Sequence, residues 1–318
     1  MITVLLPTAA RPAMLRTALK SVAGQTACPK IDRVIVSENG GNRDSENICA
    51  QFPSLPITYL FRVPMTALEH GRALIHECPE SELTAYLHDD DWWTPTHLAN
   101  AIERLESHPD SVAYGSSHFV VSGESSMLNC SGNLFPWFGA NYAPFKPAWE
   151  LSRLNVLMAE LLGTIAHYST LVVRTESLKK ASYVFDLNNP FDNDRMLLFA
   201  LSTFGSILFN PVPEAFVRNH GVQDCFAFDT QSRIRHMCGT TRWMVETSGK
   251  SWGLVASTFA KRMAMCPPEA VATLKALAAK EWCVPELSRH LNRREPILSR
   301  QTATPELVGA SSSMEAIR

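Results

Sequence analysis

The sequence predicts an α/β fold in which a mostly parallel sheet is flanked by helices. Two observations support this prediction. Short apolar runs alternate four times with segments of helical periodicity between residues 2 and 105, which is the pattern of consecutive strand and helix units. Polar or acidic residues follow these runs directly, and the carboxyl ends of parallel strands are where such a sheet carries its ligand loops.

The first half of the chain supplies the alternating elements. The apolar runs expected to form strands are residues 2–6, 33–37, 57–61 and 83–87. The segments expected to form helices between them are residues 13–22, 45–52 and 66–77. A fourth helix is expected with Thr94 as its N-cap and Pro95 as its first residue, because Leu98, Ile102 and Leu105 then share one face.

The second half mixes strands and helices less regularly. Strands are expected at residues 112–121, 167–174, 206–209 and 214–217, and helices at residues 150–162 and 175–181. Another helix is expected to open near Asp194 and to end at Gly205. From Asp229 onward the pattern is helical, and the small polar residues 301–318 are expected to be disordered.

The composition excludes several classes of protein. Hydrophobic residues make up 46% of the 318 residues and charged residues 19%, with a formal net charge of -2, so neither a disordered chain nor a nucleic-acid-binding surface is expected. The eight cysteines include no C-x-x-C pair, which favours reduced thiols in a cytoplasm over a zinc site or a disulfide framework. Neither a signal peptide nor a membrane-spanning run is recognisable.

The strongest candidate for a site is the acidic triplet Asp89, Asp90 and Asp91, which follows the expected strand at residues 83–87. Three adjacent carboxylates beside a buried strand repel one another and favour a bound cation, such as Mg²⁺ or Mn²⁺. The alternative is that they only complement the dipole of the following helix.

Two other loops, residues 7–11 and 37–41, follow strands and are expected at the same edge of the sheet. The chain contains neither the glycine fingerprint of dinucleotide-binding folds nor a P-loop. A diphosphate would therefore be held by a metal on the acidic triplet, helped by Arg11 or Arg72.

Further candidates lie in the second half. Asp194 is expected in the first turn of its helix, where the helix dipole favours the ionised carboxylate that accepts a proton, although an ordinary capping residue lies there too. His220 follows the last expected strand and is either structural or a ligand. The aromatic-rich residues 122–147 either pack an irregular segment or stack on sugar rings.

Four motifs, in this order, resemble the family 2 inverting glycosyltransferases of the GT-A fold: ITVLLPTAARPAMLRTALKSVAGQT, VIVSENGG, YLHDDDWWTPTHL, and FDNDRMLLFALSTFG followed by VRNH. Three positions depart from the family pattern. His88 stands where a further Asp is frequent, Asn193 where an acidic residue is usual, and Ala73 where Asn is common.

The resemblance implies the metal-assisted transfer, with inversion, of a sugar from a nucleoside-diphosphate sugar to an acceptor hydroxyl. It implies Asp194 as the catalytic base, with Asp192 as a substitute. The implied metal ligands are Asp89, Asp91 and His220, and the pair Asp90 and Asp91 is an open alternative for the two acids. The residues implied to hold the nucleotide are Pro7, Thr8, Ala9, Arg11, Glu38, Arg72, Asp89, Asp90 and Arg218.

The resemblance also implies a domain organisation. Residues 1–122 would be the nucleotide-sugar-binding part of one GT-A domain, residues 123–228 its acceptor-binding and catalytic-base part, and residues 229–318 a helical C-terminal extension. That extension is interpreted as a packed appendage or as a peripheral membrane contact.

Such a cytoplasmic enzyme, at the inner face of the membrane, would serve a surface polysaccharide or a lipid-linked glycan. The alternatives are a sugar nucleotidyltransferase and a catalytically degenerate glycan-binding or scaffold subunit.

Overall fold

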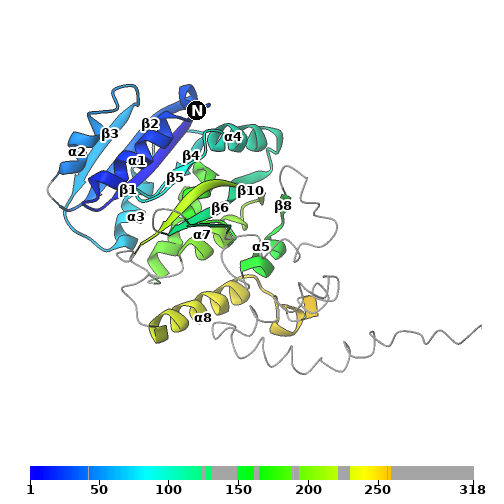
Figure 1. The fold of residues 1–318 in the computed structure, drawn as a ribbon. Helices are drawn as coiled ribbons and strands as arrows, with labels where there is room; N and C mark the ends of the chain where they lie inside the picture. The colour runs from blue at the N-terminus through cyan, green and yellow to red at the C-terminus, as the bar shows by residue number, and fades with distance from the viewer. Residues whose placement is uncertain are drawn as a thin grey trace, which may run out of the picture.

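The computed structural model describes residues 1–41, 43–122, 126–129, 149–160, 165–187, 189, 193–220, 230–255 and 257–258. Its strands form one sheet in the order β3-β2-β1-β4-β9-β6-β10-β5 (Figure 1). The strands from β3 to β4 are parallel to one another, β9 runs antiparallel to both of its neighbours, and β6 and β10 are parallel. The predicted α/β fold with a mostly parallel sheet is confirmed.

The first half of the chain forms the expected alternation. Its elements are β1 (Ile2–Thr8), α1 (Pro12–Ala23), β2 (Ile31–Asn39), α2 (Asp44–Cys49), β3 (Ile57–Arg62), α3 (Ala67–His76) and β4 (Leu83–Tyr86). β2 is followed by Gly40 and Gly41, whose φ angles of 74° and 95° lie in the left-handed region that glycine tolerates. The chain therefore turns sharply at the edge of the sheet where the ligand loops lie.

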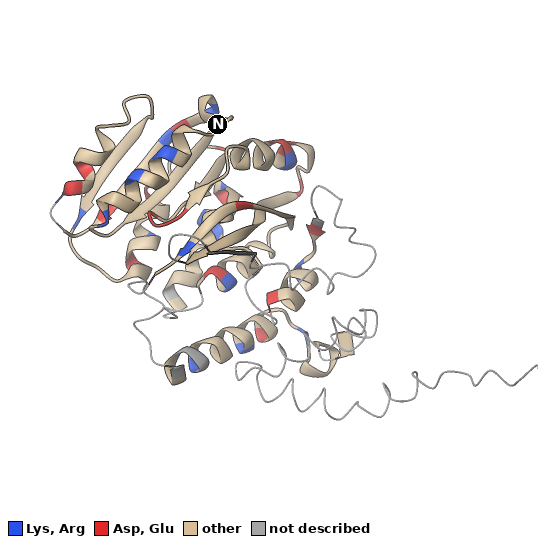
Figure 2. Ribbon diagram, viewed as in Figure 1, with Lys and Arg blue, Asp and Glu red and all other residues tan. Residues whose placement is uncertain are grey.

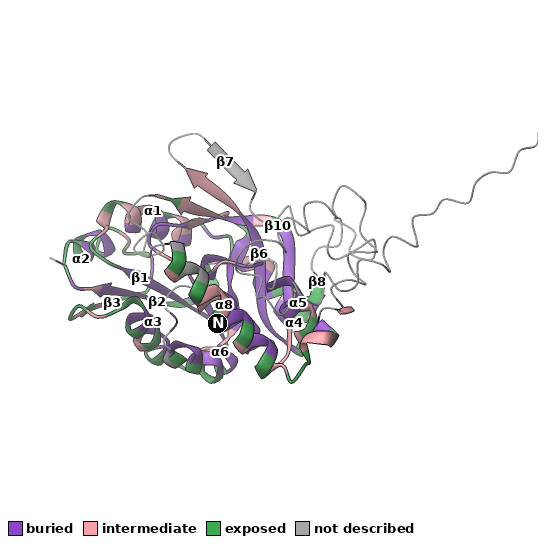
Figure 3. Ribbon diagram, turned by 90° about the horizontal axis from the view of Figure 1, so that it is seen from below, coloured by how far each residue is buried: buried purple, intermediate pink, exposed green. Residues whose placement is uncertain are grey.

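Both faces of β1 are covered, which explains why its sequence is an uninterrupted apolar run. Val4 and Leu6 belong to a core on one face of the sheet, together with Leu15 and Leu19 of α1. Leu5 points the other way, into a second core. Figure 3 shows the buried strands between helices whose outer faces are exposed.

The second half extends the same sheet. Its strands are β5 (Trp92–Trp93), β6 (Ser111–Ser122), β7 (Ser126–Asn129), β8 (Trp149–Leu151), β9 (Val172–Arg174) and β10 (Ser206–Asn219). Its helices are α4 (His97–Ser107), α5 (Arg153–Glu160), η3 (Tyr168–Thr170), α6 (Thr175–Ala181), η4 (Ser182–Leu187), α7 (Asn193–Leu201) and α8 (Thr230–Thr247). The antiparallel pairing of β4 with β9 joins the two halves of the sheet, and β6 pairs with β10 along most of its length.

The expected start of the fourth helix at Pro95 is wrong. The backbone N–H of Thr94 donates to the carbonyl of Glu214 at 2.9 Å, so the chain is still paired with β10 there and α4 begins only at His97. The side chain of Gln25 completes this corner, because it donates to the carbonyl of Thr94 at 2.7 Å and accepts from the backbone N–H of Leu98 at 3.0 Å.

The two strands expected at residues 206–209 and 214–217 are one strand, β10. Its register against β6 shifts between Asn210 and Ala215. Pro211 and Pro213 lack the backbone N–H that the ladder needs, so they disturb the pairing without ending the strand.

Three other boundaries also differ from the expectation. The helix expected at residues 150–162 is the short strand β8 followed by α5, and the strand expected at residues 167–174 is the η3 turn followed by β9. The helix expected at residues 45–52 ends at Cys49. The aromatic segment 130–148 and the expected disorder of residues 301–318 lie outside the described residues.

The described part of the C-terminal extension is helical and packs on the body. Met244 and Val245 of α8 are buried in the core that contains α7, and the ring of Trp243 meets Phe199 edge to face at 5.6 Å. Acidic and basic residues lie side by side on α4 and α8 (Figure 2). Among the helices that the structure describes, none combines the length and the apolar character needed to cross a bilayer.

Candidate active site

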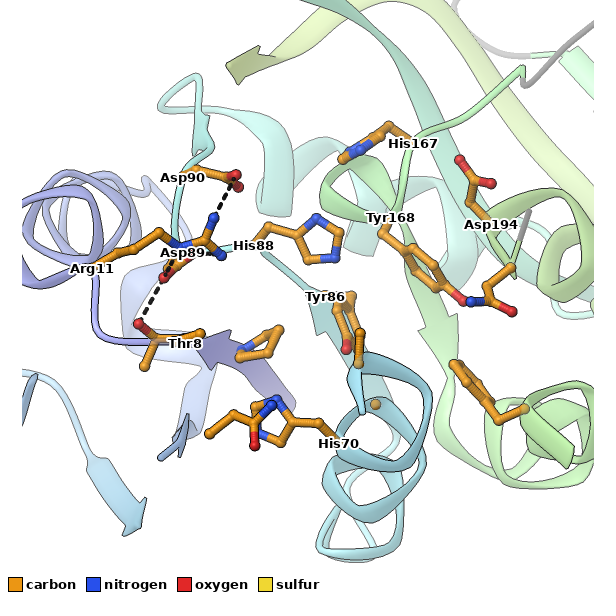
Figure 4. A pocket seen from close by; sticks show the side chains of 17 residues that line it. Thr8, Arg11, His70, Tyr86, His88, Asp89, Asp90, His167, Tyr168 and Asp194 are labelled. Carbon is orange, nitrogen blue, oxygen red and sulfur yellow. Dashed lines mark hydrogen bonds and ion pairs between the residues drawn. The ribbon is translucent and has the colours of Figure 1, made fainter. Parts of the chain in front are cut away.

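A cavity of about 320 Å³ opens at the carboxyl ends of β1 and β4 (Figure 4). Its walls come from the loop after β1, from α3, from the acidic loop after β4, from η3 and from the start of α7. The predicted site residues that line it are Pro7, Thr8, Ala9, Arg11, Asp89, Asp90 and Asp194. The topology therefore brings together residues that are far apart in the sequence.

The other predicted residues that the structure describes do not line this cavity. Asp91 and Arg218 lie behind the acidic loop, and His220 meets it from the end of β10. Glu38 is fully buried and accepts a hydrogen bond from the hydroxyl of Tyr59. Arg72 is exposed on α3. Asp192 lies outside the described residues.

Asp89 is fully buried and held by the loop after β1. The hydroxyl of Thr8 donates to its Oδ2 at 2.7 Å, and the guanidinium of Arg11 contacts Oδ2 at 3.1 Å and Oδ1 at 2.7 Å. Burial raises the pKa of Asp89 to about 6, against the opposing effects of Arg11 and Thr8. Ala10, between these two partners, has a φ of 54°, a left-handed conformation that costs a residue with a side chain about 1 kcal/mol.

Asp90 lines the cavity and has two nitrogen partners. Its Oδ2 lies 3.3 Å from Nη1 of Arg11 and 2.9 Å from Nε2 of His220. Burial alone would raise its pKa, but the charges of His88, His220 and Arg11 outweigh burial and lower it. Asp90 is therefore the acid of the triplet that stays ionised most readily.

Asp91 does not line the cavity and is 1% exposed. The hydroxyl of Ser169 donates to its Oδ2 at 2.5 Å, and the backbone N–H of Arg218 donates to its Oδ1 at 2.9 Å. Burial, followed by the charge of Asp90, raises its pKa well above the ordinary value for a carboxyl group. The guanidinium of Arg218 donates to the carbonyl of Asp90 at 3.1 Å, and its Cζ lies 5.0 Å from the centroid of the Trp92 ring. Arg218 therefore holds the acidic loop in place through two contacts.

The structure adds a histidine cluster to the predicted site. His88 and His167 line the cavity with ring centroids 5.3 Å apart, and His118 lies behind His167 at 5.8 Å. Burial, followed by the neighbouring histidines, lowers the pKa of His167 well below its ordinary value. In the sequence, His88 stood out only as a departure from a motif, and the other two gave no signal because they lie on separate elements.

Asp194 opens α7 on the far side of the cavity from Arg11 and Asp89 (Figure 4). One of its oxygens accepts from the backbone N–H of the next residue, Arg195, at 2.9 Å. Tyr168 lies beside it and has a pKa well above the ordinary value, chiefly because of burial and also because of the charges of Tyr86 and Asp194.

The wall opposite the acidic loop includes residues that the motifs did not single out. His70 of α3 is buried, with Nε2 2.8 Å from the hydroxyl of Ser37. Asn39 exchanges two hydrogen bonds of 2.9 Å with the backbone of Met65. Both line the cavity beside Pro7 and Ala9, so this end combines flat apolar surface with neutral polar groups, a lining suited to a planar ring system.

Comparison with known proteins gives three findings. Residues 3–153 match the family model described as Glycosyl transferase family 2. No curated protein matches the chain. Among solved structures, the chain is similar to S. aureus TarS 1-349 in complex with UDP-GlcNAc, with a TM-score of 0.55 and 15% identity over 92% of this chain and 72% of that chain.

Two further TarS structures agree with this likeness. The complex of TarS 1-349 with UDP gives a TM-score of 0.52 and 15% identity over 92% of this chain and 71% of that chain. Another structure of TarS 1-349 gives a TM-score of 0.54 and 12% identity over 92% and 81%. At these identities the likeness establishes the fold.

Proposed function

Since residues 3–153 match the glycosyl transferase family 2 model and the chain has the GT-A fold, we propose that the protein is an inverting enzyme that transfers a sugar from a nucleoside-diphosphate sugar to an acceptor hydroxyl. One observation carries this proposal. The cavity at the carboxyl edge of the sheet brings the acidic loop, Arg11 and Asp194 around one space.

The donor would bind along the first half of the fold. The nucleoside would lie between Pro7, Thr8 and Ala9 on one side and His70 on the other, which all line the cavity, and its phosphates would then lie near Arg11, whose side chain is 29% exposed. A guanidinium suits the phosphate oxygens because it offers several donors in a fixed plane. The complexes of TarS with UDP-GlcNAc and with UDP support a uridine nucleotide as the first donor to test.

The other residues predicted for the nucleotide have more indirect roles in this proposal. Glu38 would stabilise the wall of the nucleoside end without contacting the ligand, because it is buried and hydrogen-bonded to Tyr59. Arg218 would hold the acidic loop in place. Arg72 would reach a phosphate only from outside the cavity, since it is exposed on α3.

A divalent cation fits this site, and Asp90 with His220 would hold it. Their nearest atoms lie 2.9 Å apart, and they offer one oxygen and one nitrogen ligand. Asp89, by contrast, already has Arg11 on both of its oxygens, so its role would be to place Arg11. A bound cation supplies positive charge that offsets the charge of the departing diphosphate.

Asp194 would accept the proton of the attacking hydroxyl. Inversion requires that the hydroxyl attack the anomeric carbon from the face opposite the leaving diphosphate, and Asp194 lies across the cavity from the phosphate-binding side (Figure 4). Its position in the first turn of α7 favours the ionised carboxylate that a base needs.

The acceptor and the place of action extend the same proposal. Transfer to a glycan or to a lipid-linked acceptor at the inner face of the membrane, in the cytoplasm, is consistent with the resemblance of the four motifs. The packing of α8 on the body supports a packed C-terminal appendage more than a membrane contact.

Slow hydrolysis of a donor tests the proposal without a known acceptor. The full-length protein, incubated with UDP-GlcNAc and a panel of other nucleotide sugars in the presence of Mn²⁺, should release nucleoside diphosphate, and EDTA should stop the release. A thermal-shift series with the same compounds should show stabilisation by the bound nucleotide, because a ligand that binds only the folded state stabilises it by mass action.

The same assay separates the alternatives. Release of pyrophosphate from a nucleoside triphosphate and a sugar phosphate would identify a nucleotidyltransferase instead. The absence of any turnover, with nucleotide binding retained, would favour the degenerate subunit.

A further inference from the structure

We infer that His88, Asp91 and His167 form a metal site that takes a late first-row transition ion, such as Co²⁺ or Zn²⁺, in preference to Mg²⁺. One ligand atom from each residue lies within 4.8 Å of the other two. These residues are distinct from the Asp90 and His220 pair. The inference deepens the proposed function and rests on it for the use of the ion, but binding of the ion can be measured without any donor.

The separations between the ligand atoms suit a single ion. Asp91 Oδ2 lies 3.5 Å from Nδ1 of His167 and 4.0 Å from Nδ1 of His88. Two ligands with bonds of about 2.1 Å to a tetrahedral ion lie about 3.4 Å apart. Asp91 Oδ2 and His167 Nδ1 already have this separation. His88 Nδ1 would need to move only a fraction of an ångström closer to Asp91 Oδ2.

Ser169 ties the three ligands together. Its hydroxyl donates to Asp91 Oδ2 at 2.5 Å and accepts from the backbone N–H of His88 at 3.1 Å, while its own backbone N–H donates to Nδ1 of His167 at 3.3 Å. The last bond shows that Nδ1 of His167 is unprotonated, and because this nitrogen has one lone pair, an ion bound at Nδ1 would replace the long hydrogen bond from Ser169. Partners of this kind orient metal ligands in known sites.

The burial of Asp91 also favours a bound cation, because an ionised carboxylate there would need a counter-charge. Asp91 is 1% exposed, whereas the guanidinium of Arg11 reaches only Asp89 and Asp90 in the described contacts. Asp91 is instead held by a hydroxyl and a backbone N–H. A divalent ion beside it would compensate a carboxylate that is otherwise costly to bury.

The types of ligand select the class of ion. Two imidazoles with one carboxylate suit transition ions, whereas Mg²⁺ prefers oxygen ligands in an octahedral arrangement. His118 adds a third imidazole beside His167; it is 5% exposed, and its Nδ1 has no hydrogen-bond partner in the part of the chain that the structure describes. His88 and His167 line the cavity (Figure 4), so an ion can enter and its remaining coordination positions would face the substrate.

The test is a titration of the metal-free full-length protein with CoCl₂ in the absence of nucleotide. The visible absorption of Co²⁺ should show nitrogen ligation, and calorimetry should show tighter binding of Co²⁺ and Zn²⁺ than of Mg²⁺. His88→Gln and His167→Gln should each weaken Co²⁺ binding at least tenfold, and Ser169→Ala about tenfold through the loss of ligand orientation. The matched control is His76→Gln, because His76 is exposed on α3 outside the cavity, and it should bind like the unmodified protein.

Circular dichroism and thermal unfolding of each variant establish that it is folded before its affinity is compared. Equal affinity for Mg²⁺ and Co²⁺ would overturn the inference. So would Co²⁺ binding that survives both histidine variants and is lost in Asp90→Asn or His220→Gln. If Co²⁺ is bound through nitrogen but the protein never turns over a nucleotide sugar, the metal site is supported and the proposed function fails. If the protein turns over a nucleotide sugar but Co²⁺ is not bound through nitrogen, the proposed function is supported and the metal site fails.

Discussion

Arg11 and Asp89, which are 78 residues apart in the sequence, form a two-pronged ion pair at the base of the cavity. The guanidinium contacts both oxygens of a carboxylate that is itself fully buried. The pair joins the loop after β1 to the loop after β4, so the nucleotide end and the acidic end of the site are positioned by one contact.

Replacing Arg11 with Met should destabilise the protein because the buried Asp89 would lose its counter-charge. The free energy of unfolding at pH 7.5 should fall by about 2 kcal/mol, less than for a fully buried pair because Arg11 is partly exposed. The loss should shrink at pH 5, where Asp89, whose pKa burial already raises to about 6, is protonated and no longer needs the cation. Urea denaturation at both pH values measures this.

Arg33→Met is the control for this comparison, since Arg33 is exposed on β2 and its loss should change stability by less than about 0.5 kcal/mol. Equal losses in the two variants, or a loss that grows at low pH, would show that the charge of Asp89 is not what Arg11 compensates.

Asp194→Asn should abolish sugar transfer and leave nucleotide binding nearly intact. The substitution keeps the shape and the hydrogen bond to the start of α7 but removes the proton acceptor, so turnover should fall by about 10²- to 10⁴-fold. Hydrolysis of a nucleotide sugar gives the rate, and calorimetry with UDP gives the affinity. If affinity and folding are lost along with turnover, Asp194 is a structural cap.

Much of the fold could be predicted from the sequence because the controlling signals are local. The spacing of Leu15, Ala18, Leu19 and Val22 predicts the buried face of α1, and all four are buried. The start of α4 could not be predicted, because Thr94 and Pro95 are good helix-opening residues and only the pairing of Thr94 with Glu214, 120 positions later in the chain, holds that backbone extended.

The same distinction applies to the site. The motifs identify the acidic loop, Arg11 and Asp194 because each is a short run with its own signature. His118, His167 and Ser169 carry no such signature, and they reach the site only because the η3 segment packs against both β4 and β6. Asp89, Asp90 and Asp91 are identical in the sequence, so the sequence cannot show that each side chain has different partners. Those partners depend on the direction of each side chain.

Asp90→Asn should remove the metal-dependent part of nucleotide binding, and Asp89→Asn should not. Both acids line the cavity, but Asp90 lies next to His220, whereas Asp89 is held by Arg11 and Thr8. Calorimetric titration with UDP, with Mn²⁺ and again with EDTA, isolates the metal-dependent part. The opposite result, with metal dependence lost only in Asp89→Asn, would return Asp89 to the set of metal ligands.

His70 should make stability fall as the pH drops from 7 to 5.5. Burial, followed by the charge of Arg62, lowers its pKa to about 4, compared with 6.5 for the ordinary side chain. Between these two pH values the His70 side chain binds a proton in the unfolded chain but not in the folded protein. Its contribution to the free energy of unfolding is therefore complete above pH 6.5 and is lost as the pH falls toward 4. One pH unit in this window is worth about 1.4 kcal/mol.

The measurement is urea denaturation of the unmodified protein, His70→Gln and the exposed-site control His76→Gln at pH 7 and 5.5. The protein and the control should each lose about 1 kcal/mol more over this interval than His70→Gln does, since the other buried histidines titrate equally in all three. The same pH dependence in His70→Gln would show that His70 is accessible to protons in the folded state. In that case the cavity wall at Ser37 would be open to water, and the neutral surface proposed for the nucleoside would carry a charge below pH 6.5.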